Sequence, residues 1–290
     1  ESAVALGEIK DQESVQPLID AIDFSVGAGS DRATREANEA NKEIAKALGA
    51  MRAKAAVSAL GMLTASRDNY TQVAAVEALG EIGDPAAVSA LMTLATDEAL
   101  EPFTAKKAIV ALGKIASPEA APAVMKMMFR ERKGVSFFAE SSLAAFQIGQ
   151  PMASPLLAVL KGEEREFQTW AKQNQVASGA LYAKAAQVLG DIGDRRAIAP
   201  LVARLGYKDP EELLEYAVRI AAAEALGRLR AKEAVKPLSE LVLKEREPNA
   251  KDRFCEALIR IGDREAIPQL TKTAGMLPWE LRESALRAIA

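Results

Sequence analysis

The chain has 290 residues, of which 49% are hydrophobic, 27% charged and 5% aromatic, and its net charge is −3. That length can bury a large core, and a composition dominated by Ala, Leu, Glu, Lys and Arg favours helix over strand. The charge balance supplies no overall field that would attract nucleic acid or an acidic membrane. No stretch approaches 18 uncharged apolar residues, so neither a membrane span nor a signal peptide is expected.

The sequence contains no histidine and a single cysteine, Cys255. Without histidine the chain lacks the commonest general base and the commonest metal ligand, and no cofactor is expected. One cysteine cannot form an internal disulfide, so cysteine usage does not fix the compartment. Its apolar neighbours indicate a packed thiol rather than a reactive one. A cytoplasmic location is expected, while an exported form stays open because the chain starts at Glu1 and not at Met.

A five-residue phrase, first seen as Ala5-Leu6-Gly7-Glu8-Ile9, recurs along the whole chain. Successive copies end 28 to 44 residues apart, which is the range of helical repeat proteins. The copies end at Ile9, Met51, Ile82, Ile115, Ile148, Ile192, Leu229, Ile261 and Ile289. So many copies at such spacing predict a repeat architecture.

Each phrase is followed by signals for a helix start. Two residues after the phrase stands a residue that can cap a new helix: Asp11, Asp84, Ser117, Asp194 or Asp263. Pro85, Pro118 and Pro151 then occupy the first helical position, where proline is tolerated. We therefore expect one helix to end at the phrase and a second helix to begin after a two-residue turn.

Both helices of a repeat carry a face that needs a neighbour. The second helix has an apolar stripe of helical period, as in Ile198, Leu201, Val202 and Leu205. The first helix presents alanines, so that neighbouring helices can approach closely. The leucines of the phrase are expected to be buried between repeats: Leu79, Leu112, Leu189 and Leu226. Stacked hairpins can bury both faces, whereas one hairpin cannot.

This paired-helix unit, with its ALGxIGD signature and Asp-Pro turn, resembles the HEAT-like repeats of the phycobilisome-lyase type over essentially the whole chain. The resemblance implies an all-α fold, a right-handed α-solenoid of about eight helical hairpins in a single domain over residues 1–290. Neither end carries a polar capping repeat, so we expect either a segment of a longer array or ends that pack on something else. The family includes scaffolds, lyases, DNA glycosylases and metal-dependent hydroxylases. The hydroxylases use His-Glu pairs, which this chain cannot form.

Two long intervals predict insertions at about residues 24–33 and 162–179. The first is rich in glycine and serine, as flexible loops are. The second carries Phe167 and Trp170, which share one face if the segment is helical. Two interpretations stay open: the rings cover the core, or they form an exposed anchor for a partner. The Arg- and Lys-containing segment 129–138 is expected to be a solvated loop rather than a phosphate contact.

In HEAT-like proteins the second helices usually line the concave face, which places its solvent side four, seven and eleven residues after each phrase. The acids there are Glu13, Asp20, Glu119, Glu233, Glu240 and Glu265, and the bases are Lys126, Arg196, Lys236 and Lys272. Met62 and Met152 are among the apolar residues at these positions. A duplex-binding solenoid needs a continuous basic stripe, which this mixed groove lacks. The expected ligand is therefore a protein and not nucleic acid.

The sequence therefore predicts a non-enzymatic scaffold or adaptor that binds a protein partner through the concave groove or the 162–179 insertion, with membership of a larger assembly left open. The candidate partner-binding residues are Met62, Lys126, Phe167, Trp170, Arg196, Lys236 and Lys272. No catalytic or metal-ligating residue is predicted. The alternative is an enzyme or nucleic-acid processor on the same fold, bilin-lyase-like or DNA-glycosylase-like. A glycosylase would need an acid and aromatics over a basic channel.

Overall fold

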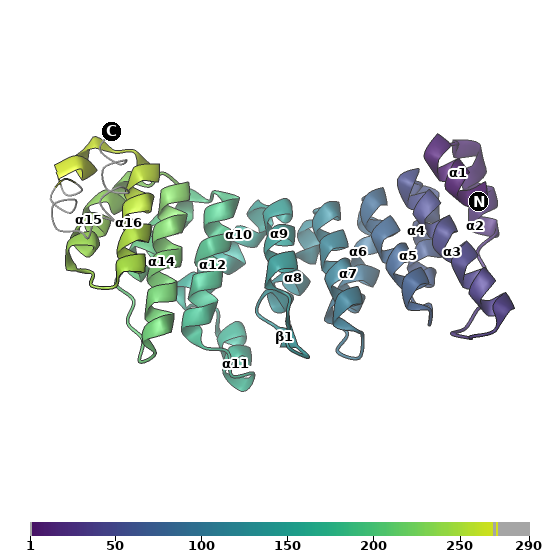
Figure 1. Ribbon diagram of the computed structural model, residues 1–290, viewed down its shortest axis with the longest axis horizontal. Coiled ribbons are helices and arrows are strands. Elements are labelled where there is room, and N and C mark those ends of the chain that lie inside the picture. The colour runs from purple at the N-terminus through teal and green to yellow at the C-terminus, as the bar shows by residue number, and fades with distance from the viewer. Residues whose placement is uncertain (1, 269–270, 272–290) are drawn as a thin grey trace. The chain divides into compact units, whose positions relative to one another are not determined.

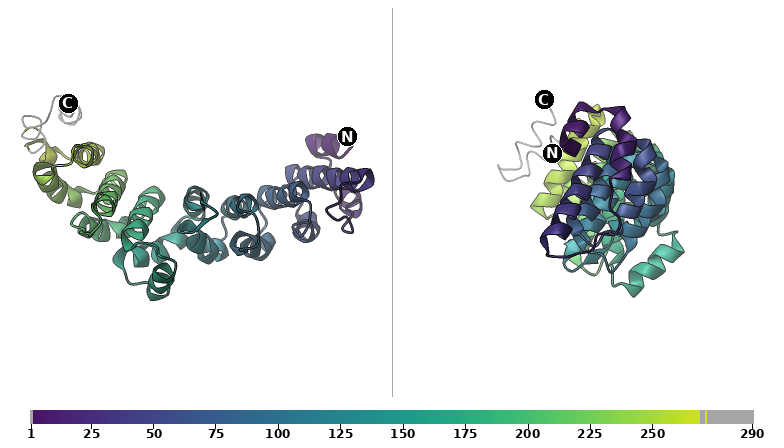
Figure 2. Two further views of the ribbon diagram at one scale, coloured as in Figure 1. Left: turned by 60° about the horizontal axis from the view of Figure 1, so that its bottom comes forward. Right: turned by 90° about the vertical axis from the view of Figure 1, so that its right-hand side faces the viewer.

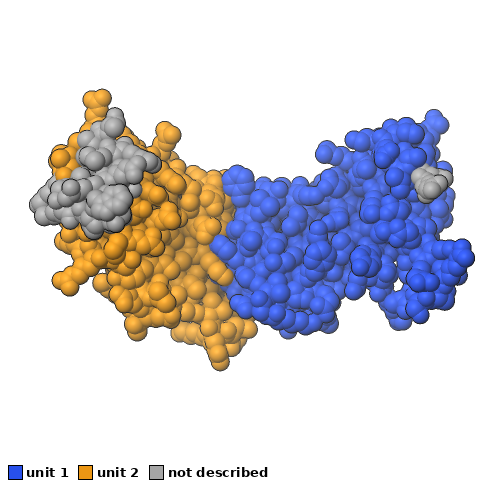
Figure 3. All heavy atoms as spheres, in the orientation of Figure 1, with its two compact units in different colours: residues 1–149 blue, residues 150–290 orange. Residues whose placement is uncertain are grey.

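The computed structural model describes residues 2–268 and 271. The chain divides into two compact units, unit 1 from Glu1 to Gly149 and unit 2 from Gln150 to Ala290 (Figure 3). The boundary directly follows the fifth copy of the repeated phrase. The phrase recurs on both sides of this boundary, as a single repeat domain would require. A single domain over residues 1–290 stays a prediction.

Unit 1 consists of helical hairpins joined by short connections (Figure 1). Its α-helices are α1 Ser2–Ile9, α2 Val15–Asp20, α3 Arg32–Ala50, α4 Val57–Leu63, α5 Asn69–Ile82, α6 Val88–Thr96, α7 Pro102–Ile115, α8 Ala121–Met128 and α9 Phe138–Ile148. The first helices of successive repeats (α1, α3, α5, α7 and α9) pack on one another, and each of α4, α6 and α8 packs on the first helix that follows it. First and second helices thus form two layers, seen nearly end-on in the left view of Figure 2.

The phrase marks the places where first helices touch. A Cβ atom built on Gly80 would lie 2.9 Å from the Cα of Ala111, and one built on Gly113 would lie 2.8 Å from the Cα of Ala144. Those distances leave no room for a side chain, so glycine permits α5, α7 and α9 to stack backbone against backbone. We call this line of contacts at Gly80 and Gly113 the seam. Leu79 and Leu112 are completely buried beside this seam, as are Leu189 and Leu226 in unit 2, which confirms the predicted core positions.

The capping residues are confirmed, but the turn that follows them differs from the prediction. The side chains of Asp84, Ser117 and Asp194 each accept a hydrogen bond from the N–H two residues on. That short reach closes a turn of 3-10 helix before the α-helix begins. The 3-10 turns are η1 Gln12–Ser14, η2 Lys54–Ala56, η3 Pro85–Ala87, η4 Pro118–Ala120, η5 Arg195–Ala197, η6 Lys232–Ala234 and η7 Arg264–Ala266.

A small hairpin interrupts the helices of unit 1 between α8 and α9. Strands β1 Glu131–Arg132 and β2 Val135–Ser136 are antiparallel, with Glu131 opposite Ser136 and Arg132 opposite Val135. The segment expected to be a loop, in a fold expected to have no sheet, therefore contains a two-stranded ribbon. Lys133 and Gly134 both adopt the positive φ of its tight turn.

Unit 2 repeats the hairpin plan with one added helix. Its α-helices are α10 Gln150–Lys161, α11 Arg165–Gln173, α12 Ser178–Ile192, α13 Ile198–Arg204, α14 Glu212–Arg228, α15 Val235–Lys244 and α16 Pro248–Ile261. Helix α12 packs on α10 and α14, and α14 packs on α16. Helix α11 lies in the 162–179 insertion and is labelled at the lower edge of unit 2 in Figure 1.

Helix α10 starts at Gln150 without a 3-10 turn, which changes the register of its faces. Met152, expected on the solvent side, is completely buried as a result, and that expectation was wrong. Elsewhere the hairpins follow the predicted plan, and the all-α solenoid of HEAT-like hairpins is confirmed. No helix within residues 2–268 is long and apolar enough to cross a bilayer. The ninth phrase, ending at Ile289, lies outside the described residues.

Candidate functional site

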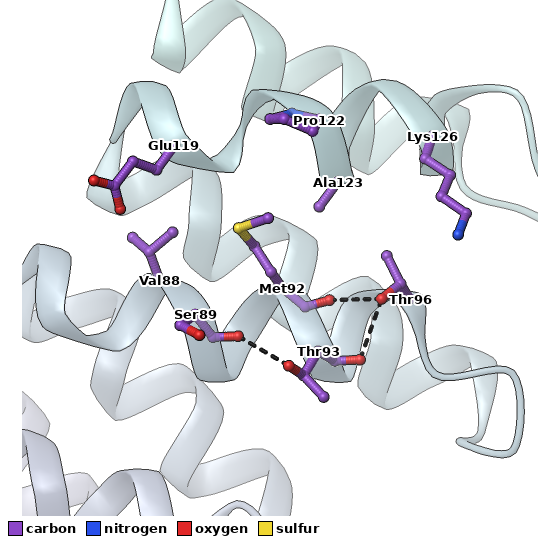
Figure 4. A pocket seen from close by; sticks show the side chains of 9 residues that line it. All are labelled: Val88, Ser89, Met92, Thr93, Thr96, Glu119, Pro122, Ala123 and Lys126. Carbon is purple, nitrogen blue, oxygen red and sulfur yellow. Dashed lines mark hydrogen bonds between the residues drawn. The ribbon is translucent and has the colours of Figure 1, made fainter. Parts of the chain in front are cut away.

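Two neighbouring second helices of unit 1 enclose a hollow on the side that the sequence predicts to face solvent. It lies between α6 and the η4–α8 segment and has a volume of about 580 Å³ (Figure 4). Its rim consists of residues from the predicted solvent positions: Ser89, Thr93, Glu119, Pro122 and Lys126. Val88 and Ala123 form a buried floor, and Met92 lies between them. We refer to this hollow as the α6–α8 groove.

The α6–α8 groove is charged at its ends and apolar in the middle. Glu119 and Lys126 stand at opposite ends in Figure 4, and no ion pair within the described part of the chain engages either of them. The hydroxyl of Thr93 donates to the carbonyl of Ser89 at 3.1 Å, and that of Thr96 to the carbonyl of Met92 at 2.9 Å. The charged groups that the groove offers are therefore one acid and one base, on either side of an apolar floor.

The remaining predicted groove residues differ in their surroundings. Met62 is 57% exposed, and Lys236 is exposed on α15. The guanidinium of Arg196 instead turns back onto Asp194, with an Nη2 to Oδ2 distance of 2.6 Å. This contact lowers the pKa of Asp194 below its ordinary value, so Arg196 is paired with a charged acid within unit 2, although its side chain stays 58% exposed. Lys272 lies outside the described residues.

The 162–179 insertion places its two rings together on α11. The ring centroids of Phe167 and Trp170 are 5.2 Å apart, with the planes tilted by 33°. Both side chains are half-buried, and Ala171 is the buried residue of this helix. The side chain of Gln168 donates to the carbonyl of Gly162 and ties α11 to the end of α10. Half-burial leaves both interpretations of the pair open.

Large exposed apolar side chains lie in and beside the connections that lead into the first helices of unit 1. We call this surface the loop edge and define it by Phe24, Met62, Arg67, Tyr70 and Phe103. Tyr70 is 78% exposed at the start of α5, and Phe103 is 61% exposed at the start of α7. Phe24 follows α2 and is also exposed.

Three adjoining hollows lie along the loop edge. The first, the Met62 hollow of about 460 Å³, is bordered by residues 23–27 and by Met62. The second, the Asn38 hollow of about 560 Å³, shares Arg67 with the first. The third, the Tyr70–Phe103 hollow of about 550 Å³, shares Lys42, Asn69 and Tyr70 with the second and has Val73 and Ala74 in its wall. The shared residues make one continuous surface of the three.

Sequence reasoning identified only part of this surface. It singled out Met62 and the 24–33 insertion but missed Tyr70 and Phe103. A signal was present, because these two rings are as far apart in sequence as Ile82 and Ile115 and so occupy the same point of successive repeats. An apolar ring repeated at a helix start, outside the core positions, marks an exposed row rather than a packed one.

The basic side chains of the 129–138 segment bind acidic and carbonyl groups of the preceding connection. Arg130 contacts Glu98 at 2.8 Å and Lys133 contacts Glu101 at 2.8 Å, while Arg132 donates to the carbonyl of Asp97. These contacts tie the β1–β2 ribbon to the loop before α7 within unit 1. The basic side chains that could bind a phosphate are therefore already engaged by groups of the protein.

Cys255 is a packed residue, as the sequence predicted. It is buried in α16, and burial raises the pKa of its thiol to about 12. The reactive thiolate is therefore scarce near neutral pH. No cluster of three or more Cys, Asp and Glu side chains that could hold a metal ion occurs among residues 2–268 and 271.

Stacked helical hairpins with glycine seams, capped 3-10 turns and leucine cores define a helical repeat protein. The sequence profile of HEAT repeats matches residues 30–105 and 212–290, and that of the PBS lyase HEAT-like repeat matches residues 1–24 and 181–207. Together the HEAT-repeat matches cover more than half of the chain. The chain belongs to the HEAT-repeat family.

Solved structures similar to the chain include two that span nearly all of it. One is human deoxyhypusine hydroxylase in complex with glycerol, with 17% identity, a TM-score of 0.37 and coverage of 98% of each chain. Another is the complex of CpcE and CpcF of phycocyanin lyase from Nostoc sp., with 18% identity, a TM-score of 0.40 and coverage of 92% of this chain and 96% of that one. No curated protein sequence matches the chain.

Proposed function

We propose that this protein is a non-enzymatic scaffold or adaptor that binds a partner protein, with the loop edge of unit 1 as its principal contact surface. One observation carries the proposal: four large apolar side chains, Phe24, Met62, Tyr70 and Phe103, are exposed around adjoining hollows. Single exposed apolar residues are ordinary, but clustered ones around concave surface are typical of protein contacts. Aromatic residues and methionine are also the types enriched at such contacts.

The stacked helices hold these side chains in place before any partner arrives. Tyr70 and Phe103 lie ten residues before Gly80 and Gly113, on helices whose backbones touch at those glycines. A rigid support lowers the entropy cost of binding, because the contact residues need little further ordering. The α6–α8 groove is the second surface that fits a protein, since its isolated acid and base suit a segment with both charges.

The mixed charges of the second helices favour protein over nucleic acid. Within the α6–α8 groove, Glu119 offsets Lys126 across an apolar floor. Duplex binding requires several neighbouring cations that displace phosphate counterions. The absence of histidine from the sequence adds support for a role without general-base or metal chemistry.

Site-specific photocrosslinking tests the proposal. Benzoylphenylalanine placed at Phe103, and separately at Tyr70, is expected to crosslink one and the same protein in an extract of the source cell. Leu213, which is 77% exposed on α14, is the matched control position and should not crosslink that protein. Absence of a shared product at Phe103 and Tyr70, or the same product at Leu213, would contradict the proposal.

A further inference from the structure

The Asn38 hollow differs from its neighbours because it combines polar groups from two repeats. It is bordered by residues 28–30 of the α2–α3 connection, by Arg35 and Asn38 on α3, and by residues 67–70 at the start of α5. Tyr70 closes one side of it and faces the Tyr70–Phe103 hollow as well. A ligand that enters the Asn38 hollow can therefore continue over Tyr70 into an apolar hollow.

The acids that border these two hollows are all engaged by groups of unit 1. Three of them form ion pairs: Glu39 with Lys42 at 2.6 Å, Glu77 with Lys107 at 2.5 Å and Glu101 with Lys133 at 2.8 Å. The fourth, Asp68, caps α5 by accepting hydrogen bonds from the N–H and the hydroxyl of Thr71, each at 2.8 Å. The first three carboxylates are balanced by lysines, whereas Asp68 keeps its negative charge because both of its partners are neutral groups.

Two arginines of the Asn38 hollow have no such partner. Lys42 and Lys46 pair with Glu43, but no ion pair among the described residues reaches Arg35 or Arg67. Both arginines are exposed. Asp68 offsets one of these charges, so the lining of the hollow keeps a net positive charge. This charge favours a ligand with carboxylates, since guanidinium groups bind these in two-point contacts.

Asn38 supplies a second and independent observation. One helical turn along α3, Asn41 holds the backbone of the α2–α3 connection with both atoms of its amide: its Oδ1 accepts from Asp23 N–H at 3.0 Å and its Nδ2 donates to Asp23 O at 2.8 Å. Asn38 makes only half of this contact, because its Nδ2 donates to Gly27 O at 3.1 Å. The residue is 7% exposed, and its buried Oδ1 has no donor within the described structure.

A buried acceptor without a donor destabilises the free protein, so a ligand that supplies an N–H relieves this cost on binding. An extended peptide carries such a donor on every residue except proline. Gly27 and Gly29 stand in the exposed connection beside Asn38, and a glycine-containing connection can adjust to admit a chain.

We propose that the Asn38 and Tyr70–Phe103 hollows bind an extended acidic segment of the partner protein. This inference rests on the function proposed above and specifies the chemistry of the partner. Carboxylates of the segment pair with Arg35 and Arg67, a main-chain N–H donates to Asn38 Oδ1, and an apolar side chain packs between Tyr70 and Phe103.

A random linear peptide library selected on the immobilised full chain tests this inference. The enriched sequences are expected to carry Asp or Glu on both sides of an aromatic or aliphatic residue. The most enriched peptide, synthesised with a fluorophore, should bind about tenfold or more weakly to Arg35→Glu and to Arg67→Glu. Arg260→Glu, which reverses another exposed arginine on α16, is the matched control and should bind as the parent does.

Asn38 is tested by placing N-methyl groups along the same peptide. One N-methylated position should weaken binding to the parent about tenfold, yet make little further difference to Asn38→Ala, because the hydrogen bond is already lost there. Arg35→Glu places an acid near the N-terminus of α3 and Arg67 lies in a connection, so both variants should fold. A thermal melt equal to that of the parent checks this.

The outcomes separate this inference from the proposed function. If neutral or basic peptides are enriched, or both arginine variants bind like the parent, the inference fails while a protein-binding role stands. It also fails alone if no peptide is enriched but Phe103 crosslinks a protein. If neither occurs, both proposals fall. A duplex oligonucleotide that binds more tightly than the peptide, with the same dependence on the two arginines, would overturn the acidic segment in favour of nucleic acid.

Discussion

The seam and the loop edge of unit 1 are built from the same helices but obey different constraints. On α5 and α7 the seam holds Gly80 and Gly113, each against the backbone of the next helix, and beside it Leu79 and Leu112 are completely buried. Ten residues earlier the same helices carry large rings that are mostly exposed. The seam must repeat because every stacking contact has the same geometry, whereas the loop edge contributes little to stacking and can be specialised.

The strongest test of this comparison removes a core leucine. Leu112→Ala should lower the free energy of unfolding by about 2–5 kcal/mol, because it removes completely buried apolar volume and leaves a cavity. Leu213→Ala is the matched control and should cost less than about 0.5 kcal/mol, since that leucine is exposed. Urea unfolding followed by circular dichroism measures both, and equal losses would show the assignment of core and surface to be wrong.

The second test uses the same substitution at two glycines of unit 1. Gly80→Ala should destabilise by about 1–3 kcal/mol, because the added methyl would lie 2.9 Å from the Cα of Ala111 and the helices must separate. Gly61→Ala, inside α4, meets no atom within 4 Å and should stabilise by about 0.5–1 kcal/mol. Opposite signs from one chemical change would establish the seam, and the same sign at both sites would refute it.

The third test extends the comparison to the insertion of unit 2. Trp170→Ala should lower the free energy of unfolding by about 1–2 kcal/mol, between the values for a core residue and an exposed anchor, because Trp170 is half-buried and stacks on Phe167. Thermal and urea unfolding of this variant measure the effect. A loss of about 3 kcal/mol or more would assign the ring to the core, and a loss below about 0.5 kcal/mol together with weaker partner binding would assign it to a contact surface.

The fourth test concerns the cap that joins hairpin to hairpin. Asp194→Ala should cost about 1 kcal/mol, because it removes the acceptor for Arg196 N–H at the start of η5. The ion pair with Arg196 lowers the pKa of Asp194 from 3.8 in the folded state. Its contribution is therefore present above that value and is lost as the pH falls through the lower folded pKa. Urea midpoints of parent and variant should accordingly converge below about pH 4, and a constant difference would contradict the assignment.

Much of the fold was predictable because equivalent contacts in successive repeats require the same residue types at the same positions. The phrase glycines, the leucines and the caps Asp84, Ser117 and Asp194 perform local roles that the sequence states directly. The sequence failed where contacts depend on a changed register: α10 starts without a 3-10 turn, so Met152 turned inward. The contact of Arg196 with Asp194, an acid two residues away, was not foreseen either, and the role of Arg196 in partner binding stays a prediction.

The candidate site was less predictable because its members come from different repeats and share no position in the phrase. Asn38 and Arg35 lie on α3, while Arg67 lies in the next connection, and only the stacking of α3 against α5 brings them to one hollow. The insertion at 24–33 was recognised as a departure from the period. Which side chains of the following repeat it faces could not be read from spacing, because that depends on how far the helices approach.

The last and smallest effect on stability is also the one that most directly separates seam from loop edge. Phe103→Ser should change the free energy of unfolding by about 0.5 kcal/mol or less, because the ring is mostly exposed and its contact with Lys107 is a surface one, 5.3 Å from nitrogen to ring centroid. The same change should weaken the binding of the crosslinked partner, or of the selected peptide, by about 2 kcal/mol, as expected for a central aromatic contact. Leu213→Ser, at a residue that is also mostly exposed but lines none of the three hollows, should alter neither quantity. Binding by fluorescence anisotropy and urea unfolding of the same preparations measure both. If Phe103→Ser instead lowers the free energy of unfolding and leaves binding unchanged, the ring belongs to the core contacts of the seam. The loop edge would then not be the contact surface.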